Sequence, residues 1–172
     1  IVLLKNQNAL LPLTPEKLAG KKIYAEAFHK DPRLSEQSTA KLRALLEDLT
    51  LTDDPAEADY ALVFVAPQSG AYFNATPGYL ELDLCEGKTV HNVDEEGRPA
   101  PETHEETTVT GMGRIAEIAK TVHDRGGKVI ANLNFTLAWQ GGNLEPLCDA
   151  LTAGFDTYPE ATLDVICGSF AP

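Results

Sequence analysis

The sequence predicts an α/β fold, a three-layer α/β/α sandwich around a mostly parallel sheet of about five to six strands. Continuous apolar runs at 58–65 and 128–135 are typical of strands that are buried on both faces. Between them, Ile115, Ile118 and Val122 recur at helical spacing. Strands that alternate with helices form right-handed βαβ units, so these runs should be parallel neighbours or near-neighbours in one sheet.

The remaining elements are predicted in order along the chain. A first strand is expected at 21–28, after the break at Gly20, and a helix at 35–49, where leucines recur at helical spacing. The helix that contains Ile115 should end near 125–127, because glycine favours a C-cap. The chain then offers a short helix at 143–147, a last strand at 150–155 and a helix at 159–166 with proline at its start.

The segment from 67 to about 108 interrupts this alternation, since it shows no clear helix or long strand. It follows a parallel strand and therefore leaves the sheet at its carboxyl edge, where open α/β sheets bind ligands. It contains the aromatic residues Tyr72, Phe73 and Tyr79 and an acidic stretch. Two interpretations stay open: a solvated, partly mobile insertion, and a lid that brings aromatic faces and a carboxyl group to a polar ligand.

Composition narrows the classes of function. The chain has 172 residues and a formal net charge of −12, which argues against binding to nucleic acid or to an anionic membrane. The three widely spaced cysteines, Cys85, Cys148 and Cys167, suggest neither a disulfide framework nor a metal pair. They leave the compartment open, with a cytoplasmic location slightly favoured over secretion.

Motif searches predict no cofactor and no metal. Gly111-Met112-Gly113 lacks the third glycine and the preceding strand of a dinucleotide loop, and no Walker loop or HExxH motif occurs. Polar residues do follow the predicted strands: Gln68, Asn134 and Asp156. With Tyr72 they form a candidate site for a sugar, which needs hydrogen bonds and stacking. The same strand ends would also suit an interface with a second domain.

Four motifs, in order, resemble the C-terminal α/β-sandwich domain of family 3 glycoside hydrolases. Residues 2–6 and 10–13 are similar to the family's VLLKN…LLPL entry, and residues 58–65 to its AD-x-A-x-V-x-V strand. Residues 129–134 resemble the strand before its N-x-G-x-P turn, although the glycine and proline are absent here. Residues 161–168 resemble its A-L-x-D-V-L-x-G segment.

The resemblance implies a part of a larger enzyme. Residues 1–172 would be a single domain of a retaining β-glycosidase, with the nucleophilic Asp on an N-terminal (β/α)8 barrel of the same polypeptide. The domain would help to bind a carbohydrate substrate. The opening apolar run without an initiator Met fits the same expectation.

The resemblance also directs attention to the acid/base carboxyl group, which many members carry in the loop after the AD-x-A-x-V-x-V strand. Gly70 stands where the family's S-E-G-Y-D-R motif has its Glu, so Glu105 or Glu106, and then Glu81, become the candidates. In some members the acid/base lies on the barrel, and then none of them is catalytic. A retaining mechanism needs two carboxyl groups about 5 Å apart, so the isolated chain is predicted to be inactive.

Two other interpretations remain. The chain could be a non-catalytic α/β interaction domain that stabilises a partner barrel. It could also be a flavodoxin-like domain for a small anionic cofactor, which the net charge and the lack of a phosphate loop disfavour.

Overall fold

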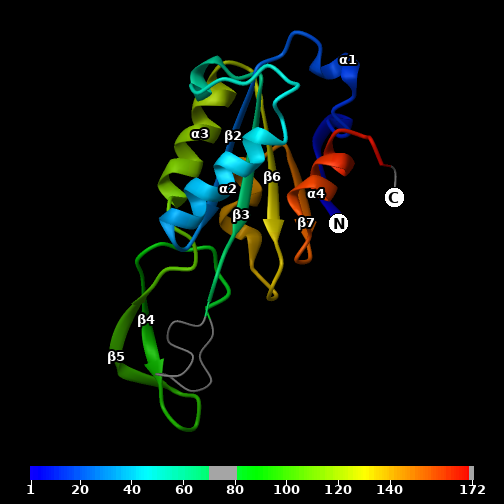
Figure 1. Cartoon of the computed structure of the whole chain (residues 1–172). Helices are drawn as coiled ribbons and strands as arrows, with labels where there is room; N and C mark the ends of the chain where they lie inside the picture. The colour runs from blue at the N-terminus through cyan, green and yellow to red at the C-terminus, as the bar shows by residue number, and fades with distance from the viewer. Residues whose placement is uncertain (70–80, 171–172) are drawn as a thin grey trace.

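A computed structural model describes residues 1–69 and 81–170. At its centre lies a five-stranded sheet in the order β1-β7-β6-β3-β2 (Figure 1). The strands are β1 (Val2–Asn6), β2 (Ile23–His29), β3 (Tyr60–Ala66), β6 (Lys128–Asn134) and β7 (Ala150–Gly154). The last four are parallel, and β1 joins the edge antiparallel to β7. The prediction that the apolar runs of β3 and β6 are parallel neighbours is confirmed.

The central strands are apolar on both sides because both sides of the sheet are covered. In β3, Ala61, Val63 and Val65 face one hydrophobic cluster, whereas Leu62 and Phe64 face the other. All five side chains are at most 9% exposed. Alternation with a period of two therefore divides one continuous apolar run between two cores, as a strand inside a three-layer sandwich requires.

The helices divide between the two faces. Helix α3 (Met112–Asp124) covers one face with Ile115, Ile118 and Val122, each fully buried. Each such side chain contributes about 1.5–3 kcal/mol of burial free energy. Helices α2 (Pro32–Ala44) and α4 (Pro159–Ile166) cover the opposite face, which we call the α2 face. The remaining helical segments are short: α1 (Pro15–Leu18) and the 3-10 turns η1 (Gln7–Ala9), η2 (Pro55–Glu57), η3 (Gly141–Asn143) and η4 (Glu145–Leu147).

Helix α2 begins earlier and ends earlier than the predicted range of 35–49. The Asp31 side chain caps it by accepting a hydrogen bond from the Arg33 N–H at 2.9 Å, and Pro32 occupies the first turn. The helix ends at Ala44, but Leu46 beyond it is still buried in the α2-face cluster. The leucine spacing therefore identified part of the buried stripe, Leu42 and Leu46, but it also included the exposed Leu45 and misplaced the ends of the helix.

One expectation about handedness is wrong. The steps from β2 to β3, from β3 to β6 and from β6 to β7 all run the same way across the sheet. The first step crosses on the α2 face, whereas the second crosses through α3, and the third places Trp139 and Leu144 in the α3-face cluster. Crossovers that run in one direction on opposite faces have opposite hands. The βαβ units therefore cannot all be right-handed.

The prediction of a segment without long strands from 67 to 108 is also wrong. Strands β4 (Lys88–Val93) and β5 (Pro99–Glu106) pair antiparallel as a hairpin, which extends beyond the carboxyl edge of the main sheet (Figure 1). The Asp94 side chain holds its turn by accepting hydrogen bonds from the N–H groups of Glu96 and Arg98. Because both strands are mostly polar and have one buried residue each, Val90 and Glu106, they carry none of the apolar periodicity that marks the main sheet.

Candidate functional site

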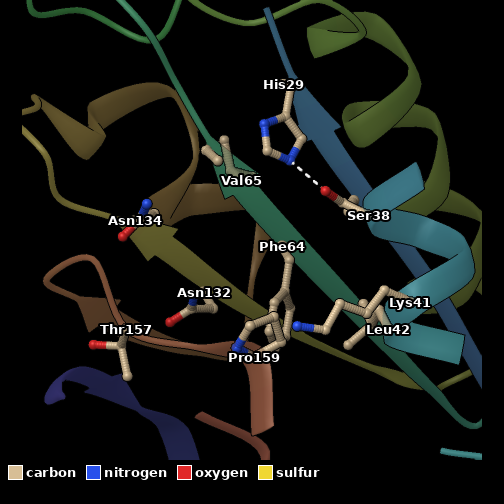
Figure 2. A pocket seen from close by; sticks show the side chains of 12 residues that line it. His29, Ser38, Lys41, Leu42, Phe64, Val65, Asn132, Asn134, Thr157 and Pro159 are labelled. Atoms are coloured by element: carbon tan, nitrogen blue, oxygen red, sulfur yellow. Dashed lines mark hydrogen bonds between the residues drawn. The ribbon is translucent and has the colours of Figure 1, made fainter. Parts of the chain in front are cut away.

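A cavity of about 280 Å³ lies on the α2 face at the carboxyl edge of the sheet, and we call it the edge pocket (Figure 2). Its polar lining comes from four elements: His29 ends β2, Ser38 and Lys41 belong to α2, Asn132 and Asn134 to β6, and Thr157 to the turn before α4. The edge pocket is therefore assembled from segments that are far apart in the sequence.

Two features of the fold leave this space open. Small side chains, Ala27 on β2 and Ala66 on β3, line the cavity where larger ones would fill it. In addition, the chain leaves β3 and β6 towards the other face, because Leu84 and Trp139 in these two connections belong to the α3-face cluster. Among the described residues, the helices that flank the pocket are α2 and α4, so the ends of β3 and β6 stay uncovered between them.

Hydrogen bonds orient the two amides of the pocket. The Asn132 Oδ1 accepts a bond from the Thr152 hydroxyl at 2.9 Å, and the Asn134 Oδ1 accepts one from the Asp156 N–H at 3.0 Å. Within the described residues, neither amide nitrogen has a hydrogen-bond partner of its own. Fixed oxygens thus leave each NH₂ group as a donor for a ligand.

Two further groups define the electrostatics of the pocket. The His29 Nε2 lies 2.8 Å from the Ser38 hydroxyl, and burial lowers the pKa of His29 although Asp31 opposes the shift. The Lys41 Nζ lies 3.0 Å from the Glu160 carboxylate and 5.8 Å from the centre of the Tyr158 ring. At neutral pH the imidazole is therefore held neutral, and Lys41 supplies the positive charge of the lining.

A second polar cluster lies where the hairpin joins the sheet, and we call Glu81, Lys88, His104 and Glu106 the hairpin base. Lys88 stands opposite Glu106 across the two strands, which places both on one face of the hairpin. The Glu106 Oε1 lies 3.0 Å from the His104 Nε2, whose other ring nitrogen contacts the Asn92 amide oxygen. Glu106 is only 2% exposed, and its Oε2 is buried without a hydrogen-bond partner in the described chain.

Glu81 is buried as well, but it forms an ion pair with Lys88. Its Oε1 accepts a hydrogen bond from the Asp83 N–H at 2.9 Å, and its Oε2 lies 3.0 Å from the Lys88 Nζ. Lys88 also donates a hydrogen bond to the Asp83 carboxylate. This bond, together with the nearby Glu81 carboxylate, raises the pKa of Lys88, although burial opposes the shift. The hairpin base therefore contains one buried carboxylate that is neutralised by an ammonium and one that has an unsatisfied oxygen.

The sequence-predicted residues fall into four groups. Asn134 lines the edge pocket, and Glu81 and Glu106 both belong to the hairpin base. Three others are exposed: Glu105 on the opposite face of the hairpin from Glu106, Gln68 after β3, and Asp156 in the turn after β7. Tyr72 lies outside the described residues, as do Phe73 and Tyr79.

Sequence reasoning missed most of the polar lining of the edge pocket, namely His29, Ser38, Lys41, Asn132 and Thr157. One signal was available. Asn132 and Asn134 are two residues apart in a buried strand, so they must point to the same face of the sheet. The contribution of α2 depends on packing between distant segments and leaves no pattern in the sequence.

Gly111, the N-cap residue of α3, has a local structural role. The Glu86 carboxylate accepts hydrogen bonds from the Gly111 and Met112 N–H groups at 3.0 and 3.1 Å, so the helix N-terminus already holds an anionic group of the protein. Gly111 has a φ of 96°, and a Cβ there would lie 2.9 Å from the Phe28 ring. Gly111 therefore allows both the left-handed cap and the close approach of β2.

Other site classes find little support in the described residues. None of their His, Cys, Asp and Glu side chains gather in groups of three or more that could hold a metal ion. No helix in the part of the chain that the structure describes is long and apolar enough to cross a membrane.

Comparison with solved structures finds a likeness in fold to a β-glucosidase. The structure of beta-glucosidase 3B from Thermotoga neapolitana in complex with glycerol matches with a TM-score of 0.51 and 18% sequence identity over 98% of this chain. The structure of the same enzyme in complex with glucose gives a TM-score of 0.48 and 17% identity over 98% of this chain. Each match spans 27% of the enzyme's chain.

No protein-family model and no curated protein matches the sequence. The structural match nevertheless confirms the predicted three-layer α/β sandwich. It also confirms, at the level of the fold, the resemblance to a β-glucosidase-like domain that the four sequence motifs predicted.

Proposed function

We propose that this chain is the C-terminal α/β-sandwich domain of a retaining β-glycosidase of family 3 of the glycoside hydrolases. Its carboxyl edge would complete a carbohydrate site on an N-terminal (β/α)8 barrel, which would carry the nucleophile. The observation that carries the proposal is the likeness in fold over 98% of the chain to 27% of a β-glucosidase. The four ordered sequence motifs point to the same family independently.

The position of the polar clusters supports this role for the carboxyl edge. The edge pocket and the hairpin base both lie at that edge, where ligands of open α/β sheets bind. Gln68 and Asp156 are exposed there, and Asn134 lines the pocket, so these residues could contact a sugar that sits between two domains. Tyr72 belongs to the same proposed set of substrate-binding residues.

Among the candidate acid/base residues, Glu106 suits the role best. A general acid needs a carboxyl oxygen that is not already engaged by the protein. The Glu106 Oε2 has no hydrogen-bond partner in the described chain, whereas both Glu81 oxygens are engaged, Oε1 by the Asp83 N–H and Oε2 by the Lys88 ammonium. Glu105 lies on the solvated outer face of the hairpin. Docking on the barrel would have to open the space over the Glu106 Oε2.

The test uses the full-length enzyme with Glu106→Ala, and with Glu105→Ala as the matched neighbour. Hydrolysis of unactivated disaccharides by Glu106→Ala should fall by roughly 10²–10⁴, the usual worth of general acid catalysis. Aryl glycosides with very good leaving groups should be spared, because their departing oxygen needs little protonation. Glu105→Ala should retain activity on both substrates.

Other outcomes would reassign the roles. Equal losses on both substrate types, or no loss on either, would remove Glu106 from the acid/base role, and Glu81→Ala would be measured next. If all three variants remain active, the chain is the non-catalytic domain of the alternative interpretation, which stabilises the barrel. The 172-residue chain alone should hydrolyse no aryl β-glycoside above a buffer blank, because it lacks the second carboxyl group of a retaining site.

A further inference from the structure

The edge pocket is rich in hydrogen-bond donors and poor in negative charge. The amide nitrogens of Asn132 and Asn134 have no hydrogen-bond partner in the described chain, and the Lys41 ammonium stands at the α2 side of the cavity (Figure 2). Among the described residues, the lining contains no Asp or Glu. This is unexpected on a chain with a net charge of −12, where a random patch of surface would include carboxylates.

We propose that the edge pocket binds a small organic oxyanion, a carboxylate or phosphate group carried by a molecule the size of one sugar. Two amide NH₂ groups and an ammonium are the kind of donors that bind carboxylate and phosphate oxygens. The volume of about 280 Å³ lies just below the usual range for drug-sized ligands, so it suits a single small molecule.

The neighbouring acidic residues do not cancel this charge pattern. Asp31 caps α2 and forms an ion pair with Arg33 at 2.8 Å. Asp156 lies in the exposed turn beyond the lining. Within the part of the chain that the structure describes, Glu160 is the one acidic group that contacts a lining cation, at 3.0 Å from the Lys41 Nζ. It stands at the start of α4, where it competes with an incoming anion for the same ammonium.

That competition gives the proposal a distinctive test. Both partners of the Lys41–Glu160 pair are about half exposed, so the pair is weak, and an anion in the pocket could replace Glu160 as the partner of Lys41. Removing the Lys41 charge should weaken oxyanion binding, whereas removing the Glu160 charge should strengthen it. A pair that served only to join α2 to α4 would give losses of stability in both variants and no gain of affinity in either.

The experiment is calorimetric titration of the 172-residue chain at constant ionic strength with glucuronate, glucose 6-phosphate and glucose. We expect millimolar binding of one or both anions and weaker binding of glucose. Lys41→Met should weaken anion binding about tenfold, the worth of a hydrogen bond to a charged group. Lys41→Arg should retain it, and Glu160→Gln should tighten it about threefold. Lys120→Met, which removes an exposed cation from α3, is the matched control and should change nothing.

The two anions distinguish whether the pocket prefers a carboxylate or a phosphate group. Binding of glucuronate alone identifies a carboxylate site, and binding of glucose 6-phosphate alone identifies a phosphate site. The proposal is overturned if neither anion binds at millimolar concentration, if glucose binds equally well, or if Lys41→Met binds as the wild type does. Thermal unfolding of each variant verifies folding. The titration does not involve the acid/base variants, so its failure would leave the proposed glycosidase role untouched.

Discussion

The two edges of the sheet use polar residues in different ways. At the amino edge, the Asp59 carboxylate accepts hydrogen bonds from the Lys22 N–H and the Lys21 ammonium, and Asp149 is bonded by three donors. At the carboxyl edge, the Asn132 and Asn134 amide nitrogens and the Glu106 Oε2 have no partner within the described residues. Polar groups that have hydrogen-bond partners within the protein stabilise its structure, whereas polar groups without partners remain available for a ligand or a reaction.

Asp149 is the clearest structural case. Its side chain is 9% exposed, and its oxygens accept bonds from the Val129 N–H at 2.9 Å, His123 at 2.8 Å and Lys128 at 3.2 Å. These contacts join the start of β6, the end of α3 and the entry to β7. A buried carboxylate with this many donors is part of the framework.

The largest expected effect is therefore at the amino edge. Asp149→Ala should lower the free energy of unfolding by about 3 kcal/mol, because it leaves the Val129 N–H, the His123 ring nitrogen and the Lys128 ammonium without this acceptor. Urea unfolding followed by circular dichroism measures this loss. Asp124→Ala removes an exposed carboxylate from the end of α3 and should change stability little. A small effect of Asp149→Ala would show that the hydrogen bonds made by polar groups at the amino edge do not determine stability.

The pH dependence of stability should reveal the same residue. Burial alone would raise the pKa of Asp149, but the Val129 N–H, His123 and Lys128 lower it below its ordinary 3.8. A carboxyl with a depressed folded pKa stabilises the protein fully above its unfolded pKa and loses that stability as pH falls through the folded value. Wild-type stability should therefore drop below about pH 4. The Asp149→Ala variant should lack this part of the drop.

The two buried glutamates of the hairpin base give an intermediate test with opposite signs. Glu81→Gln should destabilise the chain by about 1–2 kcal/mol, because it removes the ion pair with Lys88 and leaves that ammonium with one partner fewer. Glu106→Gln should stabilise it by about 1 kcal/mol, because an uncharged amide costs less to bury than a carboxylate with an unsatisfied oxygen. Equal signs would refute the distinction between the two sites.

The smallest expected effect belongs to the edge pocket. Asn134→Ala should cost less than about 1 kcal/mol, because the residue is half-buried and contributes one hydrogen bond to the Asp156 turn. The same urea titration applies. A cost as large as that of Asp149→Ala would place Asn134 in the framework and contradict the proposed difference between the edges.

Most of the main sheet was predictable from the sequence, since β3 and β6 must be buried on both faces and their apolar runs report it directly. The hairpin was not, because neither strand is buried along its length and β5 even contains Pro99 and Pro101. Its pairing depends on register and on the Asp94 turn. The family motif at residues 2–6 does not by itself indicate that they form the edge strand β1.

The candidate site was predictable in part for a similar reason. The ends of the predicted strands indicate the carboxyl edge of the sheet, which makes Asn134 a candidate. The acidic segment makes Glu81 and Glu106 candidates. The edge pocket itself arises where Ala27 and Ala66 leave space between distant segments. This arrangement depends on three-dimensional packing and cannot be seen in the sequence. The same packing buries Glu106 and leaves Glu105 exposed, although the two residues are adjacent in sequence.

The pairing of β1 with β7 has a consequence for how the protein is made. Val2 pairs with Ala153, so the sheet cannot be completed until a ribosome has released nearly the whole of this stretch of chain. Until then Val2, Leu3 and Leu4 have no neighbouring strand, and even in the finished sheet they are about half exposed. During synthesis this apolar segment is a natural target for chaperones and a starting point for aggregation.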